Sequence, residues 1–107
     1  MAEVLTNIEE LRGRIDVVDD QLVRLLNVRV ACAVEVGRLK HEAGLPIYQP
    51  EREAQVLNKV RKSATELSGP LTAEALVRIF ERIIDEARRA ERAASVRGDG
   101  LGPSIGE

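Results

Sequence analysis

A long stretch of helical periodicity, from Thr6 to about Ala43, constrains the fold of this chain more than any other feature. Apolar residues recur along it in alternating steps of three and four, the spacing of a helix that buries a narrow stripe. The stripe comprises Ile8, Leu11, Ile15, Val18, Leu22, Leu25, Arg29, Cys32, Val36 and Leu39. Every member is apolar except Arg29. Because arginine stays charged, Arg29 requires a bound anion or a paired carboxylate at that point.

The length of this helix predicts an oligomer. About 37 residues at ~1.5 Å each span roughly 55 Å. A compact chain of 107 residues has a radius of gyration near ~13 Å and a diameter of about 34 Å. One copy of the chain therefore cannot cover its own helix. Since closed two-fold dimers are the commonest oligomers, we predict an antiparallel homodimer.

Capping and helix-breaking residues predict where the first two helices begin and end. Thr6 and Glu9 have the spacing of a capping box, which places the start of the first helix at Thr6. Gly44 suits the left-handed position that ends a helix. Pro50 fits the first turn of a second helix, where its missing N–H would have no partner in any case. The first two helices should therefore be joined by a short loop.

A third helix is expected from Ala73 to about Ala94, with Thr72 as its N-cap. From residue 95 onward the sequence is rich in Gly and Pro and has no apolar periodicity. We therefore expect one all-α domain at residues 1–94, followed by a disordered tail at residues 95–107.

Composition excludes several classes of function. The formal net charge is −2, and the only aromatic residues are Tyr48 and Phe80, so neither a basic surface nor stacking groups for nucleic acid are expected. No apolar run approaches the ~18 residues of a membrane span, and we expect a cytoplasmic protein. The single cysteine, Cys32, excludes an intrachain disulfide and a thiolate metal cluster. Its place in the stripe predicts a buried, inert thiol.

Four charged residues fall on helix faces that should be apolar or half-buried: Arg29, Lys40, Glu53 and Glu91. Arg29 and Lys40 are close to three helical turns apart, so they project from nearly one face with about 16 Å between their backbones. Two cations that converge within a helical bundle predict a small dianionic ligand. For Glu53, a simple interaction with the positive end of its helix is an equally good interpretation. Glu91 would be costly on an apolar face without a partner.

Arg12 lies about 25 Å along the helix from Arg29 and cannot reach the same small ligand in its own chain. In an antiparallel dimer it could complete the partner's site, although a solvent-exposed arginine without a role is the alternative. The sequence has no Gly-rich phosphate loop, nucleophile–base pair or metal-ligand cluster. A site built from these residues suits plain binding, or a reaction accelerated by positioning and electrostatics.

Three groups of residues, in order and spacing, resemble the all-α chorismate mutases. They are Leu11-Arg12 with Ile15, Asp19, Leu22, LLNVR at 25–29 and VEVGRLK at 34–40; Pro46 with YQPERE at 48–53; and IFERII at 79–84. The match covers about residues 8 to 94. It implies an intertwined, domain-swapped homodimer of three-helix chains. It also implies conversion of chorismate to prephenate by a cofactor-independent [3,3] rearrangement, a step in phenylalanine and tyrosine biosynthesis.

The resemblance also implies roles for the charged residues. Arg29, together with Arg12 from the other chain, would bind the two substrate carboxylates. Lys40 and Glu91 would face the ether oxygen, where negative charge develops as the C–O bond breaks. Glu91 stands where many bacterial members of the family have Gln, which should make the activity depend on pH.

The remaining implied contacts concern the ring of the substrate. Glu53 and the backbone near Gln49 would take the ring hydroxyl, and Arg52 would line the site. Gln49 stands where many members have Asp, and Ala87 where many have Ser. These two departures are expected to remove secondary contacts and to weaken substrate binding.

Two further interpretations stay open. Isochorismate-pyruvate lyases share the arginine frame and would release pyruvate from a similar dianion. A non-enzymic helical dimerisation module would instead pair Arg29 with a carboxylate of its own seam, whereas an enzyme predicts an open pocket there. The tail at residues 95–107 is expected to contact another enzyme of the shikimate pathway.

Overall fold

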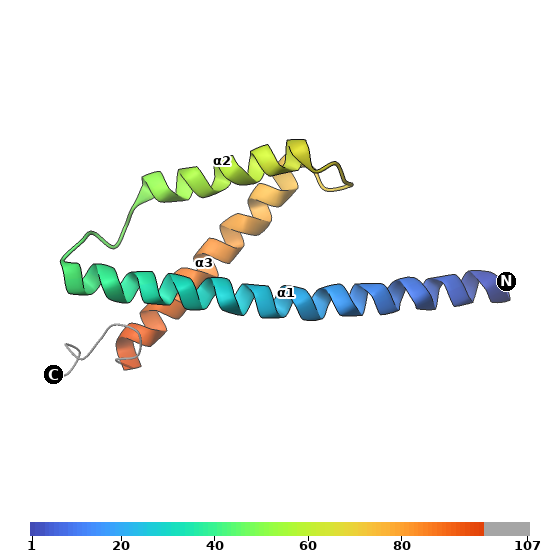
Figure 1. The fold of residues 1–107 in the computed structure, drawn as a ribbon, viewed down its shortest axis with the longest axis horizontal. Coiled ribbons are helices and arrows are strands. Elements are labelled where there is room, and N and C mark those ends of the chain that lie inside the picture. Colours follow the sequence, from blue (N-terminus) through green and yellow to red (C-terminus); the bar gives the residue numbers. More distant parts are fainter. Residues whose placement is uncertain (98–107) are drawn as a thin grey trace.

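The computed structural model describes residues 1–97 and consists of three α-helices, arranged as Figure 1 shows. They are α1 (Ala2–Ala43), α2 (Pro50–Glu66) and α3 (Ala73–Arg97). The molecule measures 65 × 28 × 15 Å, and its radius of gyration is 18.5 Å, well above the ~13 Å of a compact chain of this length. The predicted all-α fold with one long N-terminal helix is therefore confirmed.

The start of α1 differs from the prediction. The helix begins at Ala2, and Thr6 lies inside it, where the Thr6 hydroxyl donates to the carbonyl of Ala2 at 3.0 Å. The capping box is therefore wrong, and Glu9 pairs with Arg12 instead. A threonine hydroxyl can bond to the carbonyl four residues earlier, so Thr6 does not have to interrupt a helix.

The other helix ends agree more closely with the prediction. Gly44 has φ 69° and ψ 25° and ends α1 in the left-handed region, and its N–H donates to the carbonyl of His41 at 3.2 Å. Pro50 is the first residue of α2. The hydroxyl of Thr72 accepts a hydrogen bond from the N–H of Ala75 at 3.0 Å, so Thr72 caps α3. These contacts satisfy groups that helix ends otherwise leave unpaired.

The end of α3 lies beyond the predicted one. The helix continues past Ala94 to Arg97. Ala94 is buried and Ser95 is half-buried, so the last turn is held by packing that apolar periodicity alone did not reveal. The prediction of a disordered tail is therefore wrong for residues 95–97. The rest of that tail, residues 98–107, lies outside the described residues.

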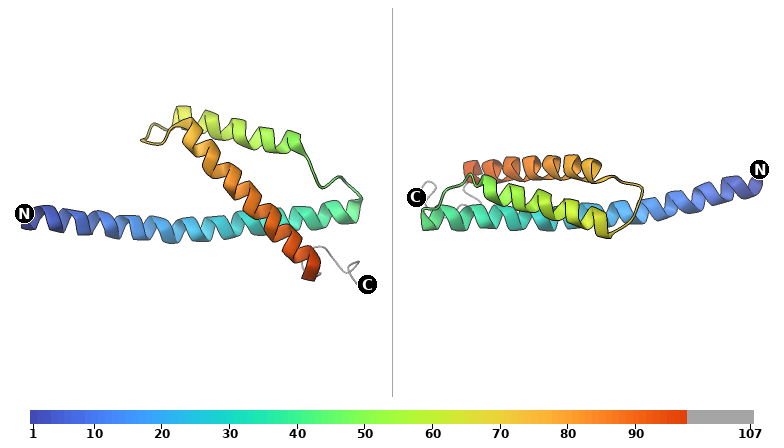
Figure 2. Two further views of the ribbon diagram at one scale, coloured as in Figure 1. Left: turned by 180° about the vertical axis from the view of Figure 1, so that it is seen from behind. Right: turned by 90° about the horizontal axis from the view of Figure 1, so that it is seen from above.

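Helix α3 connects the other two helices. It crosses α1 obliquely and also packs against α2, while within residues 1–97 the backbones of α1 and α2 do not contact each other (Figure 2). The buried apolar residues lie accordingly on α2 and α3: Val60, Val77, Ala87 and Ala94. Small side chains such as these allow helices to approach closely, and the core is correspondingly small.

The apolar stripe of α1 is uncovered along its N-terminal half. No residue of α1 is buried, and Leu11 and Ile15 keep 54% and 56% of their surface exposed. This half of the helix extends beyond α2 and α3 (Figure 1). Cys32 lies further along the same stripe and is also exposed. The prediction that its thiol is buried is therefore wrong for the single chain. Contiguous apolar surface of this extent is typical of an interaction face.

The helices of the described part are not membrane spans, since none of them combines the required length with sufficient apolar character.

Candidate active site

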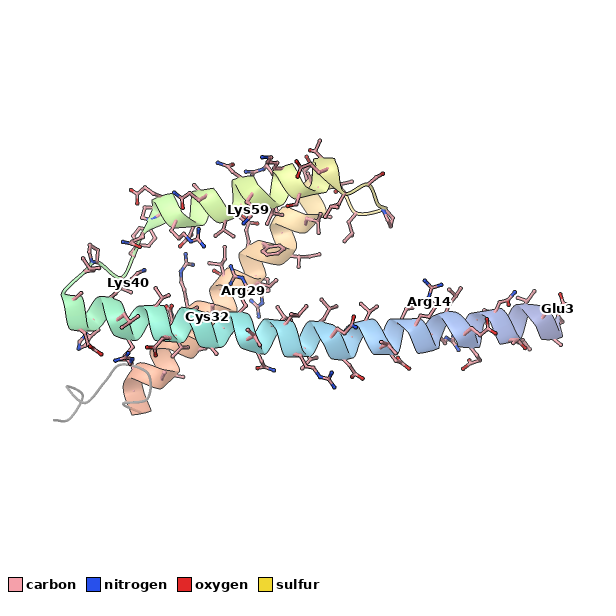
Figure 3. The ribbon with its side chains drawn as sticks, viewed as in Figure 1. Glu3, Arg14, Arg29, Cys32, Lys40 and Lys59 are labelled. Atoms are coloured by element: carbon pink, nitrogen blue, oxygen red, sulfur yellow. The ribbon has the colours of Figure 1, made fainter. Side chains whose placement is uncertain are left out.

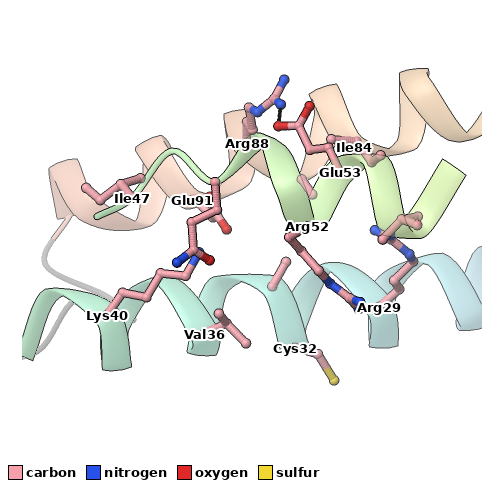
Figure 4. A pocket seen from close by; sticks show the side chains of 14 residues that line it. Arg29, Cys32, Val36, Lys40, Ile47, Arg52, Glu53, Ile84, Arg88 and Glu91 are labelled. Atoms are coloured by element: carbon pink, nitrogen blue, oxygen red, sulfur yellow. Dashed lines mark ion pairs between the residues drawn. The ribbon is translucent and has the colours of Figure 1, made fainter. Parts of the chain in front are cut away.

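A cavity of about 300 Å³ lies between the C-terminal half of α1, the start of α2 and the second half of α3 (Figures 3 and 4). Fourteen side chains line it. They include seven of the eight residues predicted from the sequence: Arg29, Lys40, Gln49, Arg52, Glu53, Ala87 and Glu91. The other walls are mainly apolar, formed by Cys32, Ala33, Val36, Ile47, Val56 and Ile84. Three helices thus bring polar groups far apart in sequence into one place.

Three cations that line the cavity, Arg29, Lys40 and Arg52, lack carboxylate partners within residues 1–97. Arg29 and Lys40 project from α1 toward α2 and α3 (Figure 4), and neither forms an ion pair within residues 1–97. Arg52 adds a third cation from α2, and its Nη1 donates, among residues 1–97, only to Oε1 of Gln55, at 3.4 Å. An open cavity at an unpaired Arg29 argues against the dimerisation module, which required a carboxylate partner there. It favours an anionic ligand.

Glu91 lies on α3 opposite Lys40 (Figure 4). Partial burial raises the pKa of its carboxyl group above the ordinary value, because the charged form loses hydration. The positive charges of Lys40, Arg88 and Arg92 act in the opposite direction, in that order, but they do not cancel the effect of burial. Burial and the neighbouring cations thus have opposite effects on the pKa of Glu91, and the effect of burial is the larger.

Gly37 on α1 lies beside the Glu91 carboxyl group. A Cβ atom added at Gly37 would lie 3.6 Å from Cδ and 3.7 Å from Oε1 of Glu91, which are ordinary van der Waals distances. Gly37→Ala should therefore raise the free energy of unfolding by about 0.5–1 kcal/mol, the usual gain in a helix interior. It should also displace water from the carboxyl group and raise the pKa of Glu91 further. Urea unfolding and an NMR titration of the Glu91 carboxyl carbon measure the two effects.

Gly13→Ala provides the matched control for this prediction. Gly13 lies on the same helix, and a Cβ atom there would meet nothing within 4 Å. Gly13→Ala should stabilise α1 to a similar degree and leave the titration of Glu91 unchanged. Identical titrations in the two variants would show that the added methyl group does not act on Glu91.

Glu53 contacts α3 through an ion pair with Arg88, in which Oε2 of Glu53 meets Nη2 of Arg88 (Figure 4). Arg88 also donates from Nη1 to Oδ1 of Asp85 at 3.0 Å. Glu53 therefore does more than interact with the positive end of its own helix.

Sequence reasoning missed Arg88. Its position next to Ala87 and one turn before Glu91 was the signal that could have found it.

Arg12 is the one predicted site residue that the single chain does not bring to the cavity. It lies on the uncovered half of α1, its side chain is 69% exposed, and its Nη1 pairs with Oε1 of Glu9 at 3.0 Å.

The described residues hold no group of three or more His, Cys, Asp or Glu side chains that could bind a metal ion. The polar groups that remain can bind a dianion and donate hydrogen bonds to it.

Comparison with known proteins identifies the family. The chorismate mutase type II family matches residues 11–92, a range that contains all the residues of the cavity. The chain belongs to this family. The resemblance stated from the sequence is therefore confirmed, and the three helices form a chorismate mutase domain.

Individual relatives agree with this assignment. A "Bifunctional chorismate mutase/prephenate dehydratase" of Aquifex aeolicus is 37% identical over 93 residues, which are 86% of this chain and 26% of that protein. A "Chorismate mutase" of Methanocaldococcus jannaschii is 26% identical over 89 residues, 83% of this chain and 88% of that protein. The solved structure of form II chorismate mutase from Thermus thermophilus has a TM-score of 0.73 at 34% identity, covering 80% of this chain and 94% of that one.

Some of the relatives are much longer proteins, and this chain matches only a part of them. The chain spans only 26% of the Aquifex protein and 23% of a "T-protein" from Enterobacter agglomerans. In contrast, it spans nearly the whole Thermus chain. The shared region is thus the helical domain itself.

Proposed function

We propose that this chain isomerises chorismate to prephenate by a [3,3] rearrangement. The observation that carries the proposal is the cavity in which Arg29 and Lys40 lack carboxylate partners within residues 1–97 and Lys40 lies opposite Glu91. Half-buried cations of this kind favour a ligand that brings its own negative charges, and chorismate is a dianion. Membership of the chorismate mutase type II family supports the same substrate.

The rearrangement needs no nucleophile, so its rate depends on positioning and on stabilising charge in the transition state. The ether C–O bond breaks while a C–C bond forms, and negative charge develops on the ether oxygen. Lys40 would donate to that oxygen from its ammonium group, and Glu91 from its protonated carboxyl group. The planar guanidinium of Arg29 would hold one substrate carboxylate through two hydrogen bonds. The contacts to the ether oxygen strengthen as the charge develops, which is what accelerates a reaction.

The other side chains of the cavity would hold the substrate ring. Glu53 and the backbone at Gln49 would accept and orient the ring hydroxyl, while Arg52 faces the substrate from α2. Ala87 offers no hydrogen bond where a serine would. We therefore expect substrate binding to depend strongly on the charged contacts.

We further infer that a second copy of the chain completes the site. A cavity of about 430 Å³ adjoins the first and shares Arg29, Arg52 and Val56 with it. Its other walls are largely apolar and include Val60, Leu67, Leu76 and Phe80. The uncovered half of α1 from an antiparallel partner would fill this cavity and bring the partner's Arg12 beside Arg29. Both the exposed stripe and the second cavity would then be covered.

Sedimentation tests this arrangement. The expected result is one species with twice the 11.8 kDa mass of the chain, because a single chain leaves the stripe of α1 exposed. The turnover of chorismate should sediment with that species. A folded and active species with the mass of one chain would contradict the dimer, and the contribution of Arg12 with it.

Activity is tested by incubating the purified chain with chorismate and following the loss of its absorbance, with the product identified by NMR. Prephenate is the expected product. A parallel incubation with isochorismate distinguishes the lyase, which would release salicylate and pyruvate. Absence of turnover in both would contradict an enzymatic function. The cytoplasmic location and a pathway-enzyme partner for the tail stay predictions.

A further inference from the structure

We propose that Arg88 is a positioning residue that holds the Glu53 carboxylate in place at the edge of the cavity, so that this carboxylate can accept the substrate hydroxyl. The inference rests on the proposed function, because it assigns Arg88 to the contact between Glu53 and the ring of chorismate.

The geometry of Arg88 supports this role. Its Nη2 meets Oε2 of Glu53 on α2, and its Nη1 donates to Oδ1 of Asp85 on its own helix at 3.0 Å. The guanidinium is therefore held between two carboxylates, and its planar fork fixes the direction of both contacts. The side chains of Arg88 and Glu53 are 37% and 33% exposed, so solvent screens the pair only in part.

The carboxylate of Glu53 has hydrogen-bonding capacity left for a substrate. An ionised carboxylate accepts hydrogen bonds at two oxygens, each with about two sites. Oε2 is occupied by Arg88, whereas Oε1 accepts no hydrogen bond from residues 1–97. A glutamate side chain that is already held loses less conformational entropy when it binds a ligand. Arg88, which also lines the cavity, thus prepares Oε1 for the hydroxyl through its contact with Oε2.

The charges around the cavity give Arg88 a second effect on the same contact. Glu53 is a negative group in a cavity that must receive a dianion, and repulsion between them would weaken binding. Arg88 offsets that charge through its contact with Oε2. Loss of Arg88 should therefore affect both the orientation of Glu53 and the KM for chorismate.

A double-mutant cycle tests the proposal on the full chain. Arg88→Ala should lower kcat/KM about tenfold, the scale of one hydrogen bond to a charged group. In a Glu53→Gln background the same substitution should lower kcat/KM less than about twofold, since the group on which Arg88 acts is then neutral. Arg88→Lys keeps the charge and loses the fork, so it should recover KM more fully than kcat. The melting temperature should fall by only a few degrees, because partly exposed pairs add little stability.

Arg89→Ala is the matched control. Arg89 is the next residue on α3, does not line the cavity and pairs at 3.6 Å with Glu86 of the same helix, so kcat/KM should not change. Equal losses for Arg88→Ala in both backgrounds, or no loss with Glu53 present, would overturn the proposal. If Arg88→Ala does not fold, Arg88→Lys carries the same cycle. Absence of turnover in the unmodified chain would instead contradict the proposed function.

Discussion

Arg29→Ala and Arg12→Ala should each lower kcat/KM by about 10²–10³-fold, and mixing the two inactive variants should restore activity. The size of the loss follows from leaving a buried substrate carboxylate without its charged partner. The recovery follows from the proposed dimer, in which each site takes Arg29 from one chain and Arg12 from the other. A dimer with one chain of each variant has one site with both arginines. Unfolding, mixing and refolding should therefore give about a quarter of the unmodified activity, because about half of the dimers are mixed.

The matched control for this complementation uses two residues of the same half-site. Arg29 and Arg52 line the same cavity of one chain, so a mixed dimer of Arg29→Ala and Arg52→Ala contains no intact site. No recovery is expected from that pair. Recovery there, or its absence with Arg12→Ala, would show that Arg12 does not complete the site of a partner.

The second large effect concerns pH. We expect kcat/KM of the unmodified chain to fall as pH rises, and kcat/KM of Glu91→Gln to stay comparatively flat. A carboxyl group donates a hydrogen bond only while it is protonated, whereas an amide donates at every pH. Loss of one donor to a developing oxyanion typically costs about 10²–10³ in rate. The profile should therefore be full below the pKa of Glu91 and decline as pH passes through it.

The position of the decline depends on the groups around Glu91. Burial raises the pKa of Glu91, so the acid form should persist to higher pH than it would for an exposed glutamate. Lys40 on α1, with Arg88 and Arg92 on α3, lowers the pKa and limits the rise. Arg92 does not line the cavity, so Arg92→Gln should move the decline to higher pH without removing a substrate contact. Parallel profiles for the unmodified chain and Glu91→Gln would remove Glu91 from the mechanism.

Sequence reasoning was most successful where one helix determines the result. The spacing of Arg29 and Lys40 placed both on one face of α1, and the structure brings both to one cavity. Gly44 and Thr72 act at the helix ends as predicted, because their local conformations and hydrogen bonds involve only neighbouring residues. Glu91 was identified because a carboxylate interrupts an otherwise apolar face.

Sequence reasoning failed where the outcome depends on other elements. Arg88 was missed because an arginine at the edge of a helix face resembles an exposed residue until its partner on α2 is known. Cys32 was expected to be buried, but a stripe position is buried only where another helix or another chain covers it. The capping-box residue Thr6 has the correct spacing, yet its hydroxyl bonds backward and the helix continues through it. For Arg88 and Cys32 the cause is the same, since periodicity identifies a face and does not identify what covers it.

The uninterrupted course of α1 restricts how this domain can change in length. Arg12 and Arg29 stand on one rigid helix, so in the proposed dimer the segment between them fixes the separation of the two active sites at about 25 Å. One inserted residue would turn Arg12 by about 100° relative to Arg29 and move it by ~1.5 Å, which would misplace it in the partner's site. An added heptad would restore the face but displace Arg12 by about 10 Å. Length variation should therefore be tolerated in the connection between α2 and α3, and excluded from residues 12–29.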